Sequence, residues 1–168
     1  MLRRYSCSNR MSIILHTRNR LEIENEQCRV LSPFEENYGA QVLERKYGGR
    51  PGFVFRSEPT GIYNCFGLVF ASRRTCIMRA AEVRKIIEDD GYREVPREEV
   101  KPGDVLLYYT EAGDDIEHSA IVIVEPKRDN NYVPTVLSKI GKWKEAIHPA
   151  NALPEYSFAY AKYYRIRD

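Results

Sequence analysis

The sequence has no long apolar run and no excess of charge of one sign, and both absences narrow what the chain can be. No window approaches the roughly 20 apolar residues that a membrane-spanning helix needs, so we expect no membrane partner. Lys and Arg number 26 against 24 Asp and Glu, a formal net charge of +2. Only residues 2–20 are locally rich in arginine, so we expect no nucleic-acid partner. With 43% hydrophobic and 30% charged residues, the 168-residue chain has the balance of a globular domain.

Cysteine is also scarce, and its spacing excludes the common zinc motifs. The four cysteines stand at positions 7, 28, 65 and 76, and none forms a C-x-x-C pair. We therefore expect no metal and no cofactor, and free thiols in a reducing compartment. The apolar patch at residues 11–15 is too short for the core of a signal peptide, so we expect a cytoplasmic protein unless a dedicated system exports it.

The sequence predicts helices followed by strands and contains no internal repeat. We expect residues 1–20 to form a flexible extension and residues 21–168 to form one domain. The apolar spacing and the flanking turn residues predict three helices, at 35–47, 64–71 and 78–90. Runs of β-branched and aromatic residues predict four strands, at 105–109, 119–124, 133–139 and 158–166. Helices followed by strands with hairpin-length gaps predict an α+β domain with an antiparallel sheet.

Cys65 has the setting of a reactive thiol. Asn64 before it is a good helix cap, so the cysteine falls in the first turn, where unpaired N–H groups and the helix dipole favour a thiolate. Gly67 allows another segment to approach closely. A buried structural cysteine is the competing interpretation, since cysteine is among the most buried residue types.

His118 is the candidate base. It precedes an apolar run and follows the turn at residues 101–104, so we expect it at the start of a strand, near a helix terminus. An imidazole beside a cysteine can take the thiol proton and return it to the leaving group.

Three motifs occur in an order that resembles a known superfamily. They are Asn64-Cys65-x-Gly67, Pro102-Gly103-Asp104-Val105 and His118-Ser119-Ala120-Ile121-Val122. Together they resemble the NlpC/P60 and CHAP cysteine amidases and peptidases, over roughly residues 63–140. The resemblance implies a papain-like fold, with N-terminal helices packed on an antiparallel sheet. It also implies that Cys65 is the nucleophile and His118 the base.

The resemblance also implies a third polar group, which orients the histidine. Ser138 lies nearest the expected position on the next strand, although the superfamily more often has His, Asn, Gln or Glu there. His148, in the segment that follows, is the alternative. Tyr63 and Asn64, beside the nucleophile, are expected to contact the substrate, and Trp143 is expected in the core.

The expected activity is acyl transfer on a peptide or another amide. The Cys65 thiolate would attack the carbonyl carbon, the backbone N–H groups at the helix start would hold the oxyanion, and His118 would protonate the leaving amine. The alternative function is a catalytically inactive binding domain on the same fold. The sequence does not indicate an oligomeric state.

Overall fold

The described part of the chain folds into a seven-stranded sheet with three α-helices. A computed structural model describes residues 11–27 and 31–166. The elements, in chain order, are α1 (Pro33–Tyr47), β1 (Val54–Phe55), α2 (Cys65–Phe70), α3 (Ala80–Asp89), β2 (Tyr92–Val95), β3 (Val105–Tyr109), β4 (Ile116–Val124), β5 (Thr135–Lys139), β6 (Glu145–Pro149) and β7 (Ala161–Ile166). Three 3-10 turns, at Arg97–Glu99, Arg128–Asn130 and Phe158–Tyr160, lie in the connections. No helix of the described segments is long and apolar enough to cross a membrane.

All strand pairs of the sheet are antiparallel, in the order β1-β6-β5-β4-β3-β7-β2. The hairpins β3–β4, β4–β5 and β5–β6 form its centre, and β7 returns to pair with β3. The α+β class and the antiparallel sheet predicted from the sequence are confirmed.

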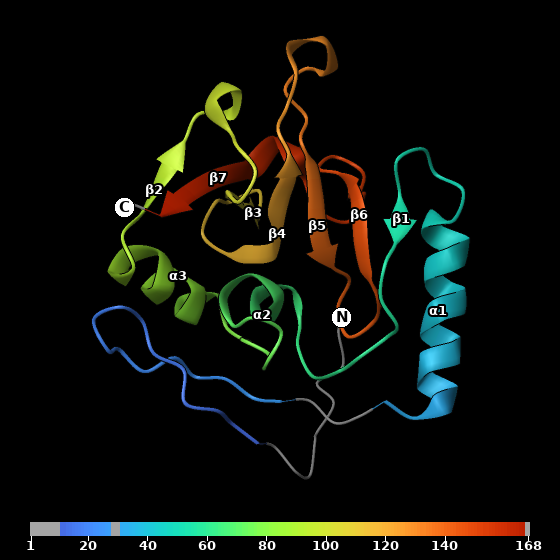
Figure 1. Cartoon of the computed structure of the whole chain (residues 1–168), viewed down its shortest axis with the longest axis horizontal. Coiled ribbons are helices and arrows are strands. Elements are labelled where there is room, and N and C mark those ends of the chain that lie inside the picture. Colours follow the sequence, from blue (N-terminus) through green and yellow to red (C-terminus); the bar gives the residue numbers. More distant parts are fainter. Residues whose placement is uncertain (1–10, 28–30, 167–168) are drawn as a thin grey trace.

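The sheet has two covered faces, and α2 and α3 lie on one of them (Figure 1). On this face Cys65 and Phe66 of α2 share a buried cluster with Val83 of α3 and with Val105 and Leu107 of β3. We call this side of the sheet the helix face.

The opposite face is covered by the segments around the 3-10 turns. There Tyr108, Ala120 and Val136 of the sheet share a second cluster with Val100 and Ala150. We call this side of the sheet the turn face. Because successive side chains of a strand point to opposite faces, each strand contributes alternate residues to the two clusters.

Helix α1 lies beside β1, at one edge of the sheet (Figure 1). Ser32 caps its start in a capping box with Glu35, which satisfies two otherwise unpaired backbone donors. Gly39 is buried where Trp143 packs, and a Cβ there would lie 2.0 Å from the indole ring. Trp143 thus packs at the edge of a core cluster that includes Leu43 and Tyr47.

Residues 11–27 form an extended arm that packs against the domain. Leu15 and Ile23 lie in the cluster of the helix face. Asn25 accepts hydrogen bonds from the Ile13 amide and the Thr75 hydroxyl. The part of the expected extension from residue 11 onward is therefore packed on the core, whereas residues 1–10 lie outside the described residues.

The three predicted helices and four predicted strands are all present, with shifted ends. Three strands were not predicted, namely β1, β2 and β6. The segment of β6, Glu145–Pro149, lacks a clear alternation of apolar and polar residues, so the sequence did not indicate a strand there. Its strand conformation depends on pairing with β5 and β1.

Candidate functional site

Cys65 is the first residue of α2, as predicted, and Asn64 is its cap. The Asn64 Oδ1 accepts a hydrogen bond from the Gly67 amide at 2.9 Å and another from the Ile77 amide at 3.2 Å. Its Nδ2 donates to the Ile77 carbonyl at 2.7 Å. These bonds attach the start of α2 to the segment before α3. They also occupy the amide of Asn64, which had been expected to contact a substrate.

Gly67 permits the close approach that was predicted for it. A Cβ at this position would lie 1.8 Å from the Thr75 carbonyl oxygen. The chain after α2 therefore turns back directly over the helix, and no larger residue fits there without moving backbone atoms.

The thiol of Cys65 is enclosed. Cys65 is 8% exposed and belongs to the buried cluster of the helix face. Burial raises the pKa of the Cys65 thiol, while the neighbouring backbone and hydroxyl groups of Ser119 act in the opposite direction. The net direction is the reverse of the activation expected at a helix start. The side chain of Cys76 is also buried, and its Sγ lies 3.7 Å from the Gly61 carbonyl oxygen and 3.6 Å from that of Ile62.

His118 lies on the other side of the sheet from Cys65. It is the third residue of β4, opposite Tyr108 in the register with β3, and the two rings are 5.5 Å apart. Tyr108 belongs to the turn face. Leu107 belongs to the helix face, and Ser119, which pairs with Leu107, lies next to Cys65 on that face. The alternation of side chains along β4 therefore separates the predicted nucleophile from the predicted base.

The surroundings of His118 keep its imidazole neutral. Its ring stacks on Tyr156 with centroids 4.4 Å apart, and the residue is 1% exposed. Burial, with a smaller effect of His148, lowers the pKa of His118 to about 3. Its Nε2 has no hydrogen-bond partner among the described residues, so it makes no contact with the Cys65 sulfur that would form a catalytic pair.

Ser138 and His148, the two candidates for the third catalytic residue, contact each other. Ser138 Oγ lies 2.8 Å from Nε2 of His148, and Nδ1 of His148 lies 2.8 Å from the Pro149 carbonyl oxygen. A carbonyl only accepts, so Nδ1 carries the proton and Nε2 accepts from the Ser138 hydroxyl. Burial lowers the pKa of His148, which fits this neutral form. Both residues are fully buried on the side of the sheet away from α2.

The structure therefore divides the predicted catalytic set into two groups. Cys65 lies on the helix face, and His118 lies on the turn face with the hydrogen-bonded pair Ser138 and His148. None of the hydrogen bonds of Ser138 and His148 orients His118 toward the thiol.

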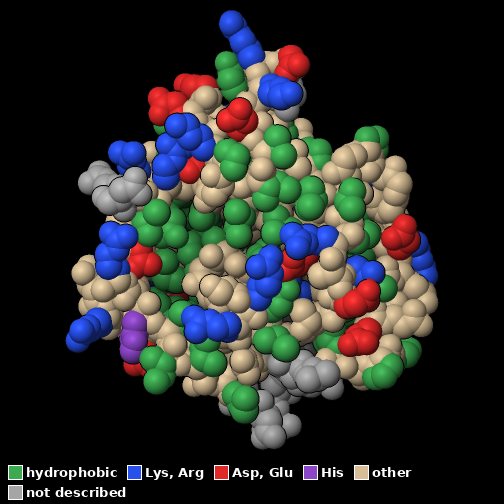
Figure 2. Space-filling model, in the orientation of Figure 1, with side chains coloured by type: hydrophobic (Ala, Val, Ile, Leu, Met, Phe, Trp, Pro, Cys, Tyr) green, Lys and Arg blue, Asp and Glu red, His purple; other side chains and the backbone are tan. Residues whose placement is uncertain are grey.

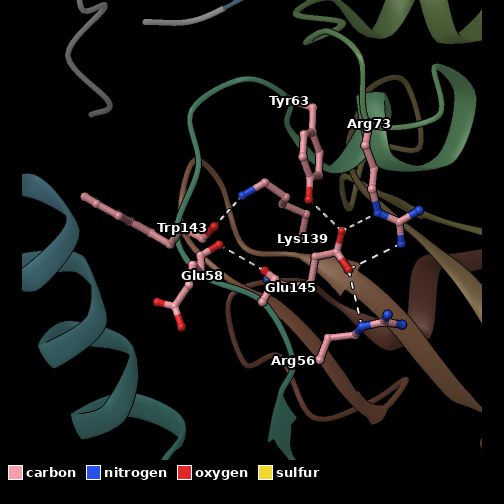
Figure 3. Close-up of polar contacts among 8 residues, drawn as sticks. Arg56, Glu58, Tyr63, Arg73, Lys139, Trp143 and Glu145 are labelled. Atoms are coloured by element: carbon pink, nitrogen blue, oxygen red, sulfur yellow. Dashed lines mark hydrogen bonds and ion pairs between the residues drawn. The ribbon is translucent and has the colours of Figure 1, made fainter. Parts of the chain in front are cut away.

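A polar cluster that sequence reasoning missed lies beside α2, on the helix face (Figure 3). The Tyr63 hydroxyl donates to Oε1 of Glu145 at 2.7 Å, and Nε of Arg73 donates to the same oxygen at 2.6 Å. Oε2 accepts from Nη2 of Arg73 at 3.3 Å and forms an ion pair with Nε of Arg56 at 3.6 Å. Burial acts to raise the pKa of the Glu145 carboxyl, but the hydrogen bonds from Arg73 and Tyr63, with a smaller effect of Arg56, hold this pKa below its usual range. We call Arg56, Tyr63, Arg73, Lys139 and Glu145 the Glu145 cluster.

Lys139 completes this cluster. Its Nζ donates to the Trp143 carbonyl and lies 4.9 Å from the centre of the Tyr63 ring. Burial lowers the pKa of Lys139 to about 8, although Glu145 acts in the opposite direction. The sequence contained one signal for this cluster, a lysine within a predicted strand, but the partners of Lys139 come from distant segments.

Tyr63 had been predicted to donate a hydrogen bond to a substrate carbonyl or carboxylate. Its hydroxyl does donate to a carboxylate, but this is the carboxylate of Glu145. Burial and Glu145 raise the pKa of Tyr63 to about 12, so the phenol remains protonated and continues to donate.

Within residues 11–27 and 31–166, no group of three or more His, Cys, Asp or Glu side chains could hold a metal ion. Comparison with family models, with curated proteins and with solved structures found no match to this chain.

Proposed function

We propose that this chain is a binding domain on a papain-like scaffold of the NlpC/P60 kind, and that it does not hydrolyse amides through Cys65. The order of elements supports the scaffold. A helix that begins with a cysteine is followed by the Pro102-Gly103-Asp104 turn, by a strand, and by a second strand that carries His118.

One observation carries the choice between binding and catalysis: the imidazole of His118 and the thiol of Cys65 occupy opposite faces of β4. A thiol needs a base within hydrogen-bonding reach, or a lowered pKa, to act as a nucleophile at neutral pH. Cys65 has neither, because burial raises the pKa of its thiol and Nε2 of His118 has no hydrogen-bond partner in the described part of the chain.

Amide hydrolysis with Cys65 as the nucleophile is the second candidate function, and two features favour it. Asn64 and the first turn of α2 would support a thiolate. A buried nitrogen without a partner, such as Nε2 of His118, is uncommon in proteins and often belongs to a functional site. In that case β4 would have to twist or shift to bring the ring to the helix face, after which the Cys65 thiolate would attack an amide carbon and His118 would protonate the leaving amine.

Alkylation of the folded protein with iodoacetamide near neutral pH tests the proposal. Labelling of each cysteine is followed by mass spectrometry, with the buried Cys76 as internal reference. We expect Cys65 to react no faster than Cys76, and both to react much faster after unfolding in urea.

A tenfold or greater preference for Cys65 in the folded protein, lost in the variant His118→Phe, would contradict the proposal and support the hydrolase. His16→Gln is the matched control, since His16 is exposed in the N-terminal arm and remote in sequence from both groups.

A further inference from the structure

The Glu145 cluster carries more positive than negative charge. Three cations, Arg56, Arg73 and Lys139, surround one carboxylate. The only other acidic side chain drawn in Figure 3, that of Glu58, points away from the two arginines. Counted over these four side chains, the cluster therefore carries a net charge of about +2. In Figure 2, basic side chains gather near the middle of the face drawn.

The two arginines differ from Lys139 in being accessible. Their side chains are 49% (Arg56) and 43% (Arg73) exposed, whereas the Glu145 side chain between them is 3% exposed. Among the described residues, Nη1 of Arg73 and the two terminal nitrogens of Arg56 have no hydrogen-bond acceptor. Guanidinium donors therefore reach the surface from both residues, on the same side of the Glu145 carboxylate (Figure 3).

Glu145 engages both guanidinium groups before any ligand arrives, that of Arg73 through two hydrogen bonds and that of Arg56 through an ion pair at 3.6 Å. Nε and Nη2 of Arg73 bind its two carboxylate oxygens, and this fork restricts the rotation of the side chain. The Arg56 backbone amide also donates to the Glu145 carbonyl, at 3.0 Å, which anchors the residue at the end of β1. Such fixed donors lose little conformational entropy when they bind a ligand.

The backbone that presents Arg73 is unusual. Ser72 and Arg73 both have a positive φ, 48° and 65°, a region that costs about 1 kcal/mol or more for residues other than glycine. The Arg73 amide donates to the Gly67 carbonyl at 3.0 Å, which ends α2 and directs the side chain toward Glu145. Neither position carries the glycine that would relieve this strain.

From these observations we propose that Arg56 and Arg73 form a binding site for an oxyanion, the phosphate or carboxylate group of a ligand. The planar fork of arginine matches the oxygens of both groups. Lys139 adds positive potential from below the surface, and Glu145 holds the two arginines in position without neutralising the cluster. This inference rests on the proposed binding function and specifies the chemistry of the ligand.

NMR titration of the full chain tests this site. Arginine Nε–H and backbone resonances are followed while sodium phosphate, sodium acetate or sodium chloride is added at constant ionic strength. We expect saturable shifts at Arg56 and Arg73 with phosphate, with acetate or with both, beyond those with chloride. A response to phosphate alone assigns a phosphorylated ligand, and a response to acetate alone assigns a carboxylate.

Variants separate a binding site from a purely structural ion pair. Arg56→Gln should weaken anion binding about tenfold or more, which corresponds to the loss of one charge-assisted hydrogen bond. Arg56→Lys keeps the charge but not the fork, and we expect intermediate affinity. Arg93→Gln, with the same charge change at an exposed position of β2, is the matched control and should bind like the original chain.

The proposal is overturned if phosphate and acetate shift the arginine resonances no more than chloride does, or if Arg56→Gln and Arg93→Gln weaken binding equally. This failure is distinguishable from failure of the proposed function. Rapid alkylation of Cys65 would contradict the binding domain whatever the anions do, and an unresponsive arginine pair would leave the alkylation result unchanged.

Discussion

At the scale of single residues, Glu145 organises more of the candidate site than Cys65 does. Its carboxylate accepts from a tyrosine and from Arg73 and pairs with Arg56, three residues from separate segments of the chain. Its backbone amide donates to the Ser57 hydroxyl. One buried acidic side chain thus joins β6 to the segment after β1 and to the segment after α2.

Replacing Glu145 by Gln should destabilise the fold by about 1–3 kcal/mol, since the charge that pairs with Arg73 is lost and one of the two accepting oxygens becomes an NH₂ group, which cannot accept. Urea unfolding at neutral pH measures the effect. Glu125→Gln removes the same charge at an exposed position and should change stability by less than about 0.5 kcal/mol. Equal effects of the two substitutions would show that the carboxylate of Glu145 is not an anchor.

At the scale of elements, α2 is too short to be stable through its own hydrogen bonds. It has six residues, fewer than an isolated helix needs, so its conformation depends on the cap and on packing against the sheet. Leu68 packs with Tyr63 of the preceding segment and with Leu137 of β5. The Asn64 side chain joins the start of the helix to Ile77.

Asn64→Ala should therefore cost more than the ~1 kcal/mol of an ordinary cap, about 2 kcal/mol or more, because the bonds to Ile77 are lost together with the cap. Asn64→Asp keeps the oxygen acceptor and loses only the Nδ2 donor. We expect its loss of stability to be smaller. Urea midpoints of the two variants give the comparison, and an order in which Asp costs more than Ala would contradict the assignment of the cap.

At the scale of the whole molecule, the structure buries ionisable groups on both faces of the sheet, and two histidines and two glutamates among them make the fold sensitive to acid. On the turn face, burial holds His118 and His148 in the neutral form. On the helix face, Glu82 and Glu145 are held as carboxylates by their basic partners. A depressed pKa gives stability above the unfolded pKa, and this stability is lost as the pH falls toward the folded pKa.

As the pH falls, the histidines should lower the free energy of unfolding before the glutamates do. The reason is that the pKa of an unfolded histidine, 6.5, is higher than the 4.5 of an unfolded glutamate. Between these two values the unfolded chain takes up protons that His118 in the fold does not. His118 then reduces stability by up to about 1.4 kcal/mol per pH unit. Urea unfolding across this interval should give a shallower pH dependence for His118→Phe than for the original chain. His16→Gln should keep the full dependence, and an unchanged slope for His118→Phe would exclude the buried neutral imidazole.

The local features of this protein were predictable from its sequence. Asn64 before an apolar run predicted the start of α2, and Gly67 predicted a close approach, since both signals lie within a few residues of their effects. The β-branched and aromatic runs of β3, β4, β5 and β7 predicted strands, and the short gaps between them predicted an antiparallel sheet. These signals are local as well.

The tertiary structure alone decided which predicted residues meet. Cys65 and His118 were expected to be neighbours because their motifs follow one another in a familiar order. Strand register and alternation, which depend on pairing between distant segments, place them on opposite faces of the sheet. The same long-range pairing makes a strand of the polar segment Glu145–Pro149 and brings Arg56 and Arg73 to one carboxylate. Local sequence patterns determined the three helices and four of the strands, whereas the remaining strands and the contacts between elements depended on packing between distant segments.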